Sequence, residues 1–351
     1  MFIMEYLESV EDKLDAINEE NMIYYDIFDY PELVYGTINL ASHNVNFSKI
    51  PQTLRKSITN EEQLKNMDNL SHSSYGLRLR FHTNAKRIIF KINLKQDYHY
   101  DNIPRANSRG FDVYSLDYDR YIHKTTIISE NRKDCFAEEI IFEEEDNNIC
   151  IFLPNFDTIN KLFIGIEKGN SIDELPYLGH NKLPIIFCGN EYTIGKTASK
   201  SGNSYPNITS QILDQNIINL SYYQMNKAEE KLATFIGKFN CESIIMDYNG
   251  QDINKNDFKE SYEKFYDKLR IFHPHKQLII LTSLLDDNNE YNPTIYEFYN
   301  DKKRNDDKII LIDKKELLKE NGIPTDCSNQ KNNDEILKVI AEEICNLMKK
   351  Y

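Results

Sequence analysis

The sequence predicts a two-domain protein in which an antiparallel β-sandwich precedes an α/β domain built on a parallel sheet. Between residues 23 and 175, short runs of alternating apolar and polar residues are separated by turn residues, which is typical of a sandwich. From residue 176 onward, apolar strands alternate with helical patterns, and this order predicts parallel strands with helices on both faces. The length of 351 residues fits two domains, because one domain averages roughly 150 residues.

The first domain, residues 23–175, is predicted from short and closely spaced strands. They cover residues 76–81, 87–92, 111–114, 121–128, 138–142, 150–153 and 161–166, with no helical segment between them. Ahead of this domain, apolar residues recur at the 3–4 spacing of an amphipathic helix. The sequence therefore predicts an N-terminal segment, residues 1–22, whose single helix over residues 4–20 packs on the body of the protein.

The second domain, residues 176–351, is predicted from strands and helices that alternate along the chain. The strands cover residues 185–188, 217–220, 243–247, 277–282 and 308–312, and the helices cover 205–214, 226–239, 256–271, 293–304 and 333–349. An asparagine-rich stretch at 329–334 is predicted to be a loop. In such folds the ligand site lies at the carboxyl ends of the strands. The loops expected to build it are 189–196, 221–226, 248–255, 283–289 and the one around 321–331.

The composition of the chain limits which binding partners and which cellular location are expected. The net charge is −14, and an acidic surface repels phosphate groups, so neither nucleic acids nor anionic membranes are expected as partners. The six cysteines show no C-x-x-C spacing, which argues against the common zinc and thioredoxin patterns. The first residues lack the pattern of a signal peptide, and no run approaches 18 apolar residues. A reduced, cytoplasmic location is the default expectation, and no cofactor or metal is predicted.

Two stretches of the sequence partly match ligand-binding motifs, but neither match is complete. Residues 195–197 (GKT) follow a predicted strand, but the first glycine of a G-x-x-x-x-G-K-[ST] phosphate loop would have to stand at Asn190. The acidic stretch 247–258 lacks the glycine and glutamate of a calcium-binding EF-hand loop, because Asp252 and Phe258 occupy those positions. A nucleotide-binding protein is therefore a lesser alternative, and a solvated acidic loop is the simpler interpretation of the second stretch.

The apolar strand near residue 185 and the turn after it resemble the frame of a known family. Residues 187–195 read FCGNEYTIG and residues 198–206 read ASKSGNSYP. They resemble the turn Y-G-S-S-I-T-Q-G and the segment A-S-x-x-G-N-S-Y-P of bacterial SGNH, or GDSL-type, esterases that carry an N-terminal β-sandwich. Residues 71–81 (SHSSYGLRLRF) and 110–114 (GFDVY) are similar to the sandwich motifs of that family. The resemblance covers residues 23–351 and implies a flavodoxin-like three-layer α/β/α SGNH-hydrolase domain behind the sandwich.

The nucleophile and oxyanion positions of the family are changed in this chain. The nucleophilic serine corresponds to Glu191. The glycine that supplies an oxyanion donor corresponds to Ser221, whose backbone N–H is expected to remain a possible donor. The asparagine donor corresponds to Gln251, with Asn249 as a second candidate. A carboxylate at the nucleophile position would repel the oxyanion that ester hydrolysis must form.

The acid–base pair of the family is also missing. Its D-G-x-H-P-x-D block is best matched by residues 321–326, where Asn321 replaces the aspartate and Ile323 replaces the histidine. Loss of a catalytic triad costs on the order of 10⁶ in rate. A histidine supplied by the sandwich within hydrogen-bond reach of residue 191, such as His72 or His123, would favour chemistry at this position.

The resemblance and these substitutions together predict an SGNH-fold protein that has lost ester hydrolysis. Such a protein is expected to bind a small acyl or carbohydrate ligand, or a protein partner. The alternative is an active hydrolase that acts on a small acyl ester or an acetylated glycan through a non-standard site around Glu191. Ser204 is a further candidate nucleophile, although it belongs to the G-N-S-Y-P frame, in which the family nucleophile does not lie. The simplest role for Glu191 is a contact with a donor such as Lys196, Ser221 or a tyrosine.

Overall fold

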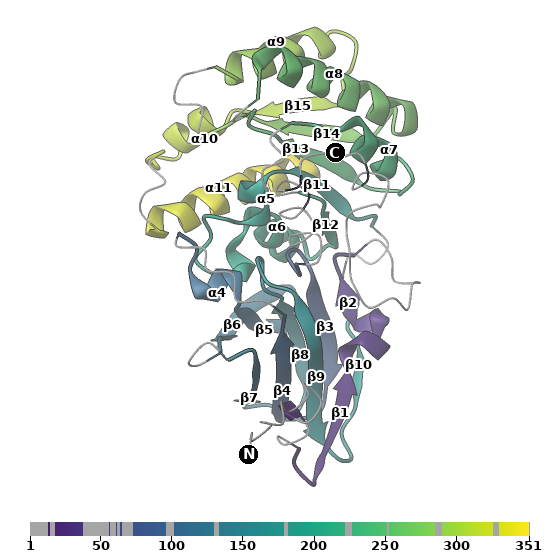
Figure 1. The fold of residues 1–351 in the computed structure, drawn as a ribbon, viewed down its shortest axis with the longest axis vertical. Coiled ribbons are helices and arrows are strands. Elements are labelled where there is room, and N and C mark those ends of the chain that lie inside the picture. The colour runs from purple at the N-terminus through teal and green to yellow at the C-terminus, as the bar shows by residue number, and fades with distance from the viewer. Residues whose placement is uncertain are drawn as a thin grey trace, which may run out of the picture.

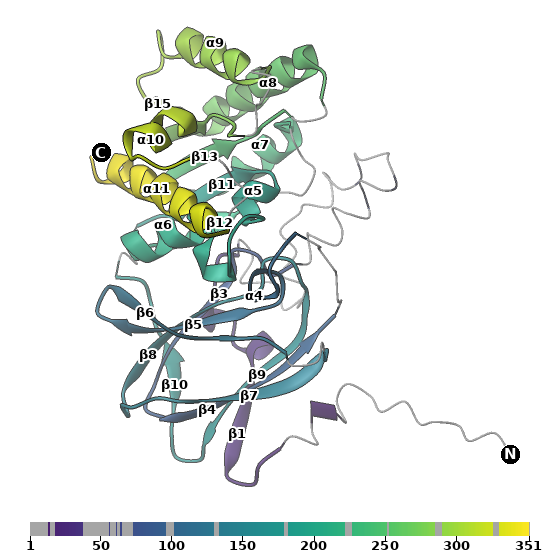
Figure 2. The ribbon, with the colours of Figure 1, turned by 90° about the vertical axis from the view of Figure 1, so that its left-hand side faces the viewer.

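The structure is a computed structural model and consists of a sandwich followed by an α/β domain. It describes residues 18–37, 73–95, 102–129, 133–178, 182–221, 227–250, 253–284, 290–325 and 330–350, together with the isolated positions 13, 14, 56, 61 and 64. Two antiparallel sheets are followed by one parallel sheet, which confirms the predicted fold class (Figure 1). The sandwich forms one end of the elongated molecule and the α/β domain forms the other (Figures 1 and 2).

Two antiparallel sheets pack face to face in the sandwich. One sheet has the order β1 (Met22–Asp26), β9 (Ile159–Glu167), β4 (Arg87–Leu94) and β7 (Cys135–Ile141). The other has the order β10 (Ile172–Glu174), β3 (Arg78–Thr83), β8 (Asn147–Phe152), β5 (Phe111–Asp117) and β6 (Arg120–Ile127), and β2 (Val34–Tyr35) pairs with β3. Facing side chains such as Phe81 and Phe90 form one core, because alternate residues of a strand point to the same face.

The parallel sheet of the second domain has the strand order of a flavodoxin-like fold. Its order is β12 (Ile217–Asn219), β11 (Ile185–Gly189), β13 (Ser243–Asp247), β14 (Gln277–Leu281) and β15 (Ile309–Ile312), and all neighbours are parallel. In chain order this is 2-1-3-4-5, so the topological switch point lies between β11 and β13.

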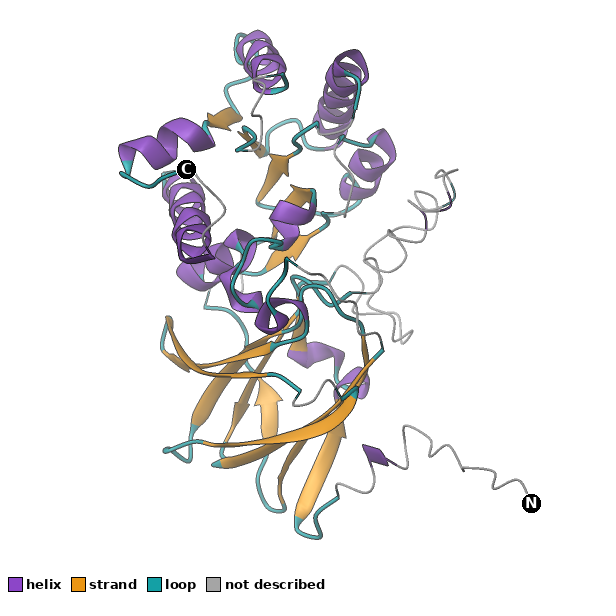
Figure 3. Cartoon of the chain, turned by 60° about the vertical axis from the view of Figure 1, so that its left-hand side comes forward, coloured by secondary structure: helices purple, strands orange, loops and turns teal. Residues whose placement is uncertain are grey.

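Helices cover both faces of this sheet (Figure 3). One face carries α7 (Glu230–Ile236), α8 (Lys255–Phe272) and α9 (Asn292–Lys302), and the other carries α6 (Tyr205–Leu213), α10 (Lys314–Glu320) and α11 (Gln330–Lys349). In β11, Ile186 and Cys188 pack in the first layer, whereas Ile185 and Phe187 pack in the second. Burial on both faces explains why this strand is a continuous apolar run instead of an alternating one.

Some elements differ from the sequence-based expectation. Most of the predicted helix 4–20 lies outside the described residues; Lys13 and Leu14 are helical, but residues 18–21 are not, so that helix ends earlier than predicted. The stretch 329–334 was expected to be a loop, yet α11 begins at Gln330. Short helical elements that the pattern does not reveal are η1 (Ile27–Asp29), η2 (Pro31–Leu33), α4 (Arg105–Ser108), α5 (Glu191–Ile194), η4 (Ser201–Asn203) and α10. None of the helices in the described part of the chain combines the length and apolar character needed to cross a lipid bilayer.

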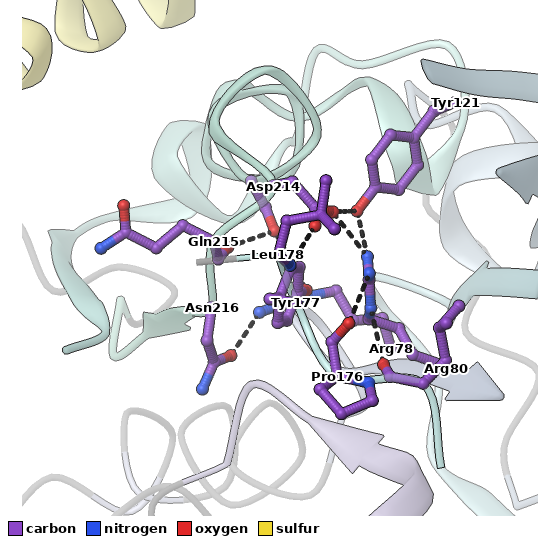
Figure 4. A network of polar contacts seen from close by, with 11 residues as sticks. Arg78, Arg80, Tyr121, Pro176, Tyr177, Leu178, Asp214, Gln215 and Asn216 are labelled. Atoms are coloured by element: carbon purple, nitrogen blue, oxygen red, sulfur yellow. Dashed lines mark hydrogen bonds and ion pairs between the residues drawn. The ribbon is translucent and has the colours of Figure 1, made fainter. Parts of the chain in front are cut away.

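Two arginines of β3 join the sandwich to the α/β domain (Figure 4). Arg80 Nη1 lies 2.9 Å from Asp214 Oδ1, which ends α6, and both side chains are almost fully buried. Arg78 donates to Asn216 Oδ1 at 2.5 Å and to the Ile217 carbonyl oxygen at 3.0 Å. Both guanidinium groups also contact the ring of Tyr177, in the segment between the domains. The outer face of β3 is therefore a buried polar seam.

A second set of contacts brings two of the sequence motifs together at the seam. Asp112, in the G-x-D-x-Y motif of β5, accepts a hydrogen bond from the Gly202 backbone N–H at 2.6 Å. Ser201 Oγ donates to the Gly110 carbonyl oxygen, and Lys200 Nζ donates to the Tyr114 hydroxyl at 3.1 Å. The motif of the sandwich thus holds the G-N-S-Y-P segment that follows the first turn of the α/β domain.

Candidate functional site

The first turn of the α/β domain lies at the switch point of the sheet. Gly189 ends β11, and Asn190 caps α5 by accepting a hydrogen bond from the Tyr192 N–H at 3.0 Å. Gly195, with φ of 113°, ends α5 in the left-handed region that glycine favours. The turn is therefore a tight helix-forming corner and not a loop that wraps phosphate groups.

Replacement of Gly189 by alanine is expected to destabilise the protein by about 1–3 kcal/mol, the usual cost of overpacking. A Cβ atom at this position would lie 2.5 Å from the Asp247 carbonyl oxygen, which belongs to the neighbouring strand and cannot move without disturbing the sheet. The urea midpoint of the purified variant, followed by circular dichroism, measures the effect. An unchanged midpoint would contradict this account of the corner.

A small cavity lies at the carboxyl edge of the sheet beside this corner. Its volume is about 40 Å³. Since a cavity needs roughly 10–15 Å³ to hold one water molecule, it has room for about three or four. The lining combines a polar side with an apolar wall and consists of Asn190, Tyr192, Thr197, Tyr205, Asp247, Asn249, Ser283, Leu284, Lys314, Asn333, Ile336, Leu337 and Ile340.

A buried ion pair forms the polar side of the cavity. Lys314 Nζ, at the start of α10, lies 2.7 Å from Asp247 Oδ1, at the end of β13, and the two side chains are 7% and 3% exposed. The Tyr205 hydroxyl lies 3.0 Å from Asp247 Oδ2, and Thr193 Oγ1 lies 3.3 Å from the same oxygen. Burial, and then the negative charge of Asp247, raises the pKa of Tyr205 well above its usual range, so this phenol stays neutral and donates. Both oxygens of Asp247 are therefore satisfied.

Glu191 does not line the cavity. Its side chain is 8% exposed, and Lys196 Nζ lies 3.5 Å from its Oε1 atom. Its carbonyl oxygen accepts hydrogen bonds from the Gly195 and Lys196 N–H groups. The carboxylate thus contacts Lys196, one of the donors that the sequence suggested.

The expected oxyanion donors are only partly described. The Ser221 backbone N–H, expected to be a possible donor, is engaged at 3.1 Å by Asn219 Oδ1, and the Ser221 carbonyl oxygen accepts from the Tyr75 hydroxyl. Gln251 lies outside the described residues. The second candidate, Asn249, is buried and lines the cavity. Ser221 therefore takes part in the contact with the sandwich through its carbonyl oxygen.

Asn321 and Ile323, which were expected to correspond to the family's aspartate and histidine, do not line the cavity. Asn321 is exposed at the end of α10, where its Nδ2 donates to the Leu317 carbonyl oxygen at 2.8 Å. Ile323 packs on the apolar core next to α11. His72 lies outside the described residues, and His123 contacts Thr126 and the Tyr114 ring within the sandwich. Among the described residues, no histidine lines the cavity.

The sequence pattern did not identify Lys314, Tyr205 or Asn333 as site residues. A signal for Lys314 exists, because it stands just after the predicted end of β15 and so at the carboxyl edge of the sheet. Asn333 stands where the predicted loop 329–334 overlaps the predicted helix 333–349, and α11 carries it to the cavity. Ser204 is buried at the start of α6 and is not a lining residue.

Two family models match consecutive parts of the chain. The N-terminal model of SGNH-hydrolase-type esterases, GxDLY, matches residues 22–172. The model of the GDSL-like lipase and acylhydrolase family matches residues 182–340. No curated protein matches the chain.

Solved structures share the fold at low sequence identity. A protein from Bacteroides ovatus described as a GDSL-like lipase has a TM-score of 0.77 and 20% identity, over 94% of this chain and 98% of that chain. The salicylyl-acyltransferase SsfX3 from a tetracycline biosynthetic pathway has a TM-score of 0.70 and 12% identity, over 94% and 96% of the two chains. A family two carbohydrate esterase from Clostridium thermocellum, in complex with cellohexaose, has a TM-score of 0.55 and 10% identity, over 79% and 94%.

Proposed function

Because the chain belongs to the SGNH/GDSL-type hydrolase family, we propose that it is a member that has lost ester hydrolysis and uses the esterase fold to bind a ligand. The observation that carries this proposal is the state of the nucleophile position. Glu191 stands there, its carboxylate contacts Lys196, and it does not line the cavity. A serine hydrolase needs a nucleophile, a base within hydrogen-bond reach and donors aimed at the oxyanion.

The cavity favours a small acyl compound as the ligand. The side chains of Ile336, Leu337 and Ile340 offer an apolar wall for a methyl group, and Lys314 offers a positive charge for a carbonyl or carboxylate oxygen. A volume of about 40 Å³ suits a group the size of acetyl and excludes a long acyl chain. A glycan ligand, suggested by the carbohydrate esterase of similar fold, would bind through such an acetyl substituent.

Hydrolysis of p-nitrophenyl acetate by the purified protein is expected to stay at the rate of the buffer blank. Glu191→Ala should leave this rate unchanged. Glu191→Ser should not raise it, because no histidine lines the cavity among the described residues and its carboxylate, Asp247, is already paired with Lys314. Turnover above the blank that Glu191→Ala abolishes would contradict the proposal and favour the alternative, a hydrolase built around Glu191. Labelling of Ser204 by a serine-directed phosphonate would contradict it as well.

Binding of acetate is the matching test of the ligand class. Saturation-transfer NMR on the whole chain is expected to show contact of the acetate methyl group with the protein. Leu337→Phe, which fills the apolar side of the cavity, should remove this signal. An equal signal from the variant would show that acetate binds elsewhere and would overturn the assignment of the cavity.

A further inference from the structure

A larger hollow lies at the seam between the two domains and shares no lining residue with the cavity at the sheet edge. Its volume is about 460 Å³. It is bordered by the turn between β5 and β6 with the start of β6, by η4 and α6, and by one face of α11. We call it the seam groove; it is lined by Asp119, Tyr121, Asn203, Ile208, Gln211, Ile212, Asp334, Glu335, Lys338 and Glu342.

The lining of the seam groove carries unbalanced negative charge. Its charged groups are four carboxylates and the single ammonium group of Lys338, which pairs with Glu342 at 3.7 Å. Asp334 accepts hydrogen bonds from Ser199 and Asn203. The carboxylates of Asp119 and Glu335 are exposed and form no ion pair within the described residues. These two groups are available to a positively charged ligand.

The seam groove also has apolar side chains beside its carboxylates. Ile208 and Ile212 of α6 line the groove next to the ring of Tyr121, and Ile212 is 39% exposed. A large exposed apolar side chain beside carboxylates is the pattern of an interface with an apolar anchor and a charged rim. The groove therefore suits a segment that is both apolar and basic.

The tip of the β5–β6 hairpin, beside the groove, also favours binding of another molecule. Tyr118 directly precedes Asp119 in the two-residue turn between β5 and β6, and this residue is 76% exposed. Its φ of 61° lies in the left-handed region, which glycine and asparagine adopt more readily than a bulky residue. An exposed aromatic residue is held there against the local backbone preference, which suggests a contact outside the folded chain.

We propose that the seam groove docks a basic segment of a partner protein. Lysine or arginine side chains of the segment pair with Asp119 and Glu335, and an apolar side chain packs between Ile212 and Tyr118. Charge complementarity selects this occupant over an acidic or purely apolar one. The proposal is independent of the proposed function, because the groove and the cavity are separate.

Fluorescence anisotropy with a short fluorescein-labelled peptide of alternating lysine and leucine tests the proposal on the whole chain. The unchanged protein is expected to bind, and the double variant Asp119→Lys/Glu335→Lys should weaken binding about tenfold or more. The matched control is Glu143→Lys/Glu144→Lys, which makes the same charge change in the exposed turn between β7 and β8. It should weaken binding less than about twofold. Equal weakening by both pairs would mean general attraction to an acidic protein and would overturn the proposal, as would the absence of binding.

Tyr118→Asn separates docking from stability. Asparagine accepts the left-handed conformation, so the melting temperature should stay the same or rise. Binding of the peptide should nevertheless weaken by about threefold or more, because the aromatic anchor is lost. A peptide with serine in place of leucine should bind as weakly. Unchanged affinity of Tyr118→Asn for the original peptide would overturn the role of the hairpin tip as the anchor.

Discussion

Replacement of Arg80 by methionine is expected to lower the free energy of unfolding by about 3–5 kcal/mol, because it leaves a buried carboxylate without its cation. Arg80 and Asp214 are 1% and 4% exposed and lie 2.9 Å apart across the seam. Arg80 also donates to the Leu175 carbonyl oxygen at 3.2 Å and to the Tyr121 hydroxyl, and both contacts would be lost. The urea midpoint, followed by circular dichroism and tyrosine fluorescence, measures the loss.

Two comparisons make this result specific. Asp214→Asn added to Arg80→Met should recover a large part of the loss, because the amide removes the buried charge and can still accept from the Leu178 N–H. Arg120→Met removes an exposed pair with Asp117 and should cost about 1 kcal/mol or less. If Arg80→Met cost no more than Arg120→Met, the seam would not couple the domains energetically.

Replacement of Lys314 by methionine is expected to cost a similar amount, about 3–5 kcal/mol, for the same reason. The Lys314–Asp247 pair has a separation of 2.7 Å and side chains that are 7% and 3% exposed. Tyr205 and Thr193 would still contact Asp247, but neither carries the positive charge that balances it. Urea unfolding of the purified variant again provides the measurement.

A second variant distinguishes the charge from the packing of Lys314. Asp247→Asn/Lys314→Met should be clearly more stable than Lys314→Met alone, since it buries no unpaired charge. Lys319→Met on the same helix removes only an exposed contact with Glu316 and should cost about 1 kcal/mol or less. A double variant no more stable than Lys314→Met would show that the packing of the lysine stem, and not the ion pair, holds this edge of the sheet.

The order of elements in the second domain could be predicted because its strands are buried on both faces. Such strands are continuous apolar runs, as in Ile185–Gly189 and Ser243–Asp247, and each stands out against the helical patterns around it. The start of α11 could not be predicted, because asparagine is a weak helix former. Tertiary contacts decide it: Asn333 is buried at the cavity, and Asp334 accepts hydrogen bonds from Ser199.

The sequence predicted the edge of the sheet at which the cavity lies, but not the ion pair that forms its polar side. Asn190, Asp247, Asn249 and Ser283 lie at the strand ends where the loops of the site were expected, and all four line the cavity. The partner of Asp247 was not foreseen. Lys314 follows β15, which is separated from β13 by β14, and only the folded sheet brings the two side chains together.

The sequence by itself determined that residue 191, expected to correspond to the family nucleophile, is a glutamate, and that Arg78 and Arg80 leave β3 on the face opposite Leu79 and Phe81. A residue type and a period of two are local properties of the chain. Only the tertiary structure decided that Glu191 contacts Lys196 away from the cavity, and that the arginine face is covered by the α/β domain. The physical reason is that the period of a strand sets the direction of a side chain but not what lies in that direction.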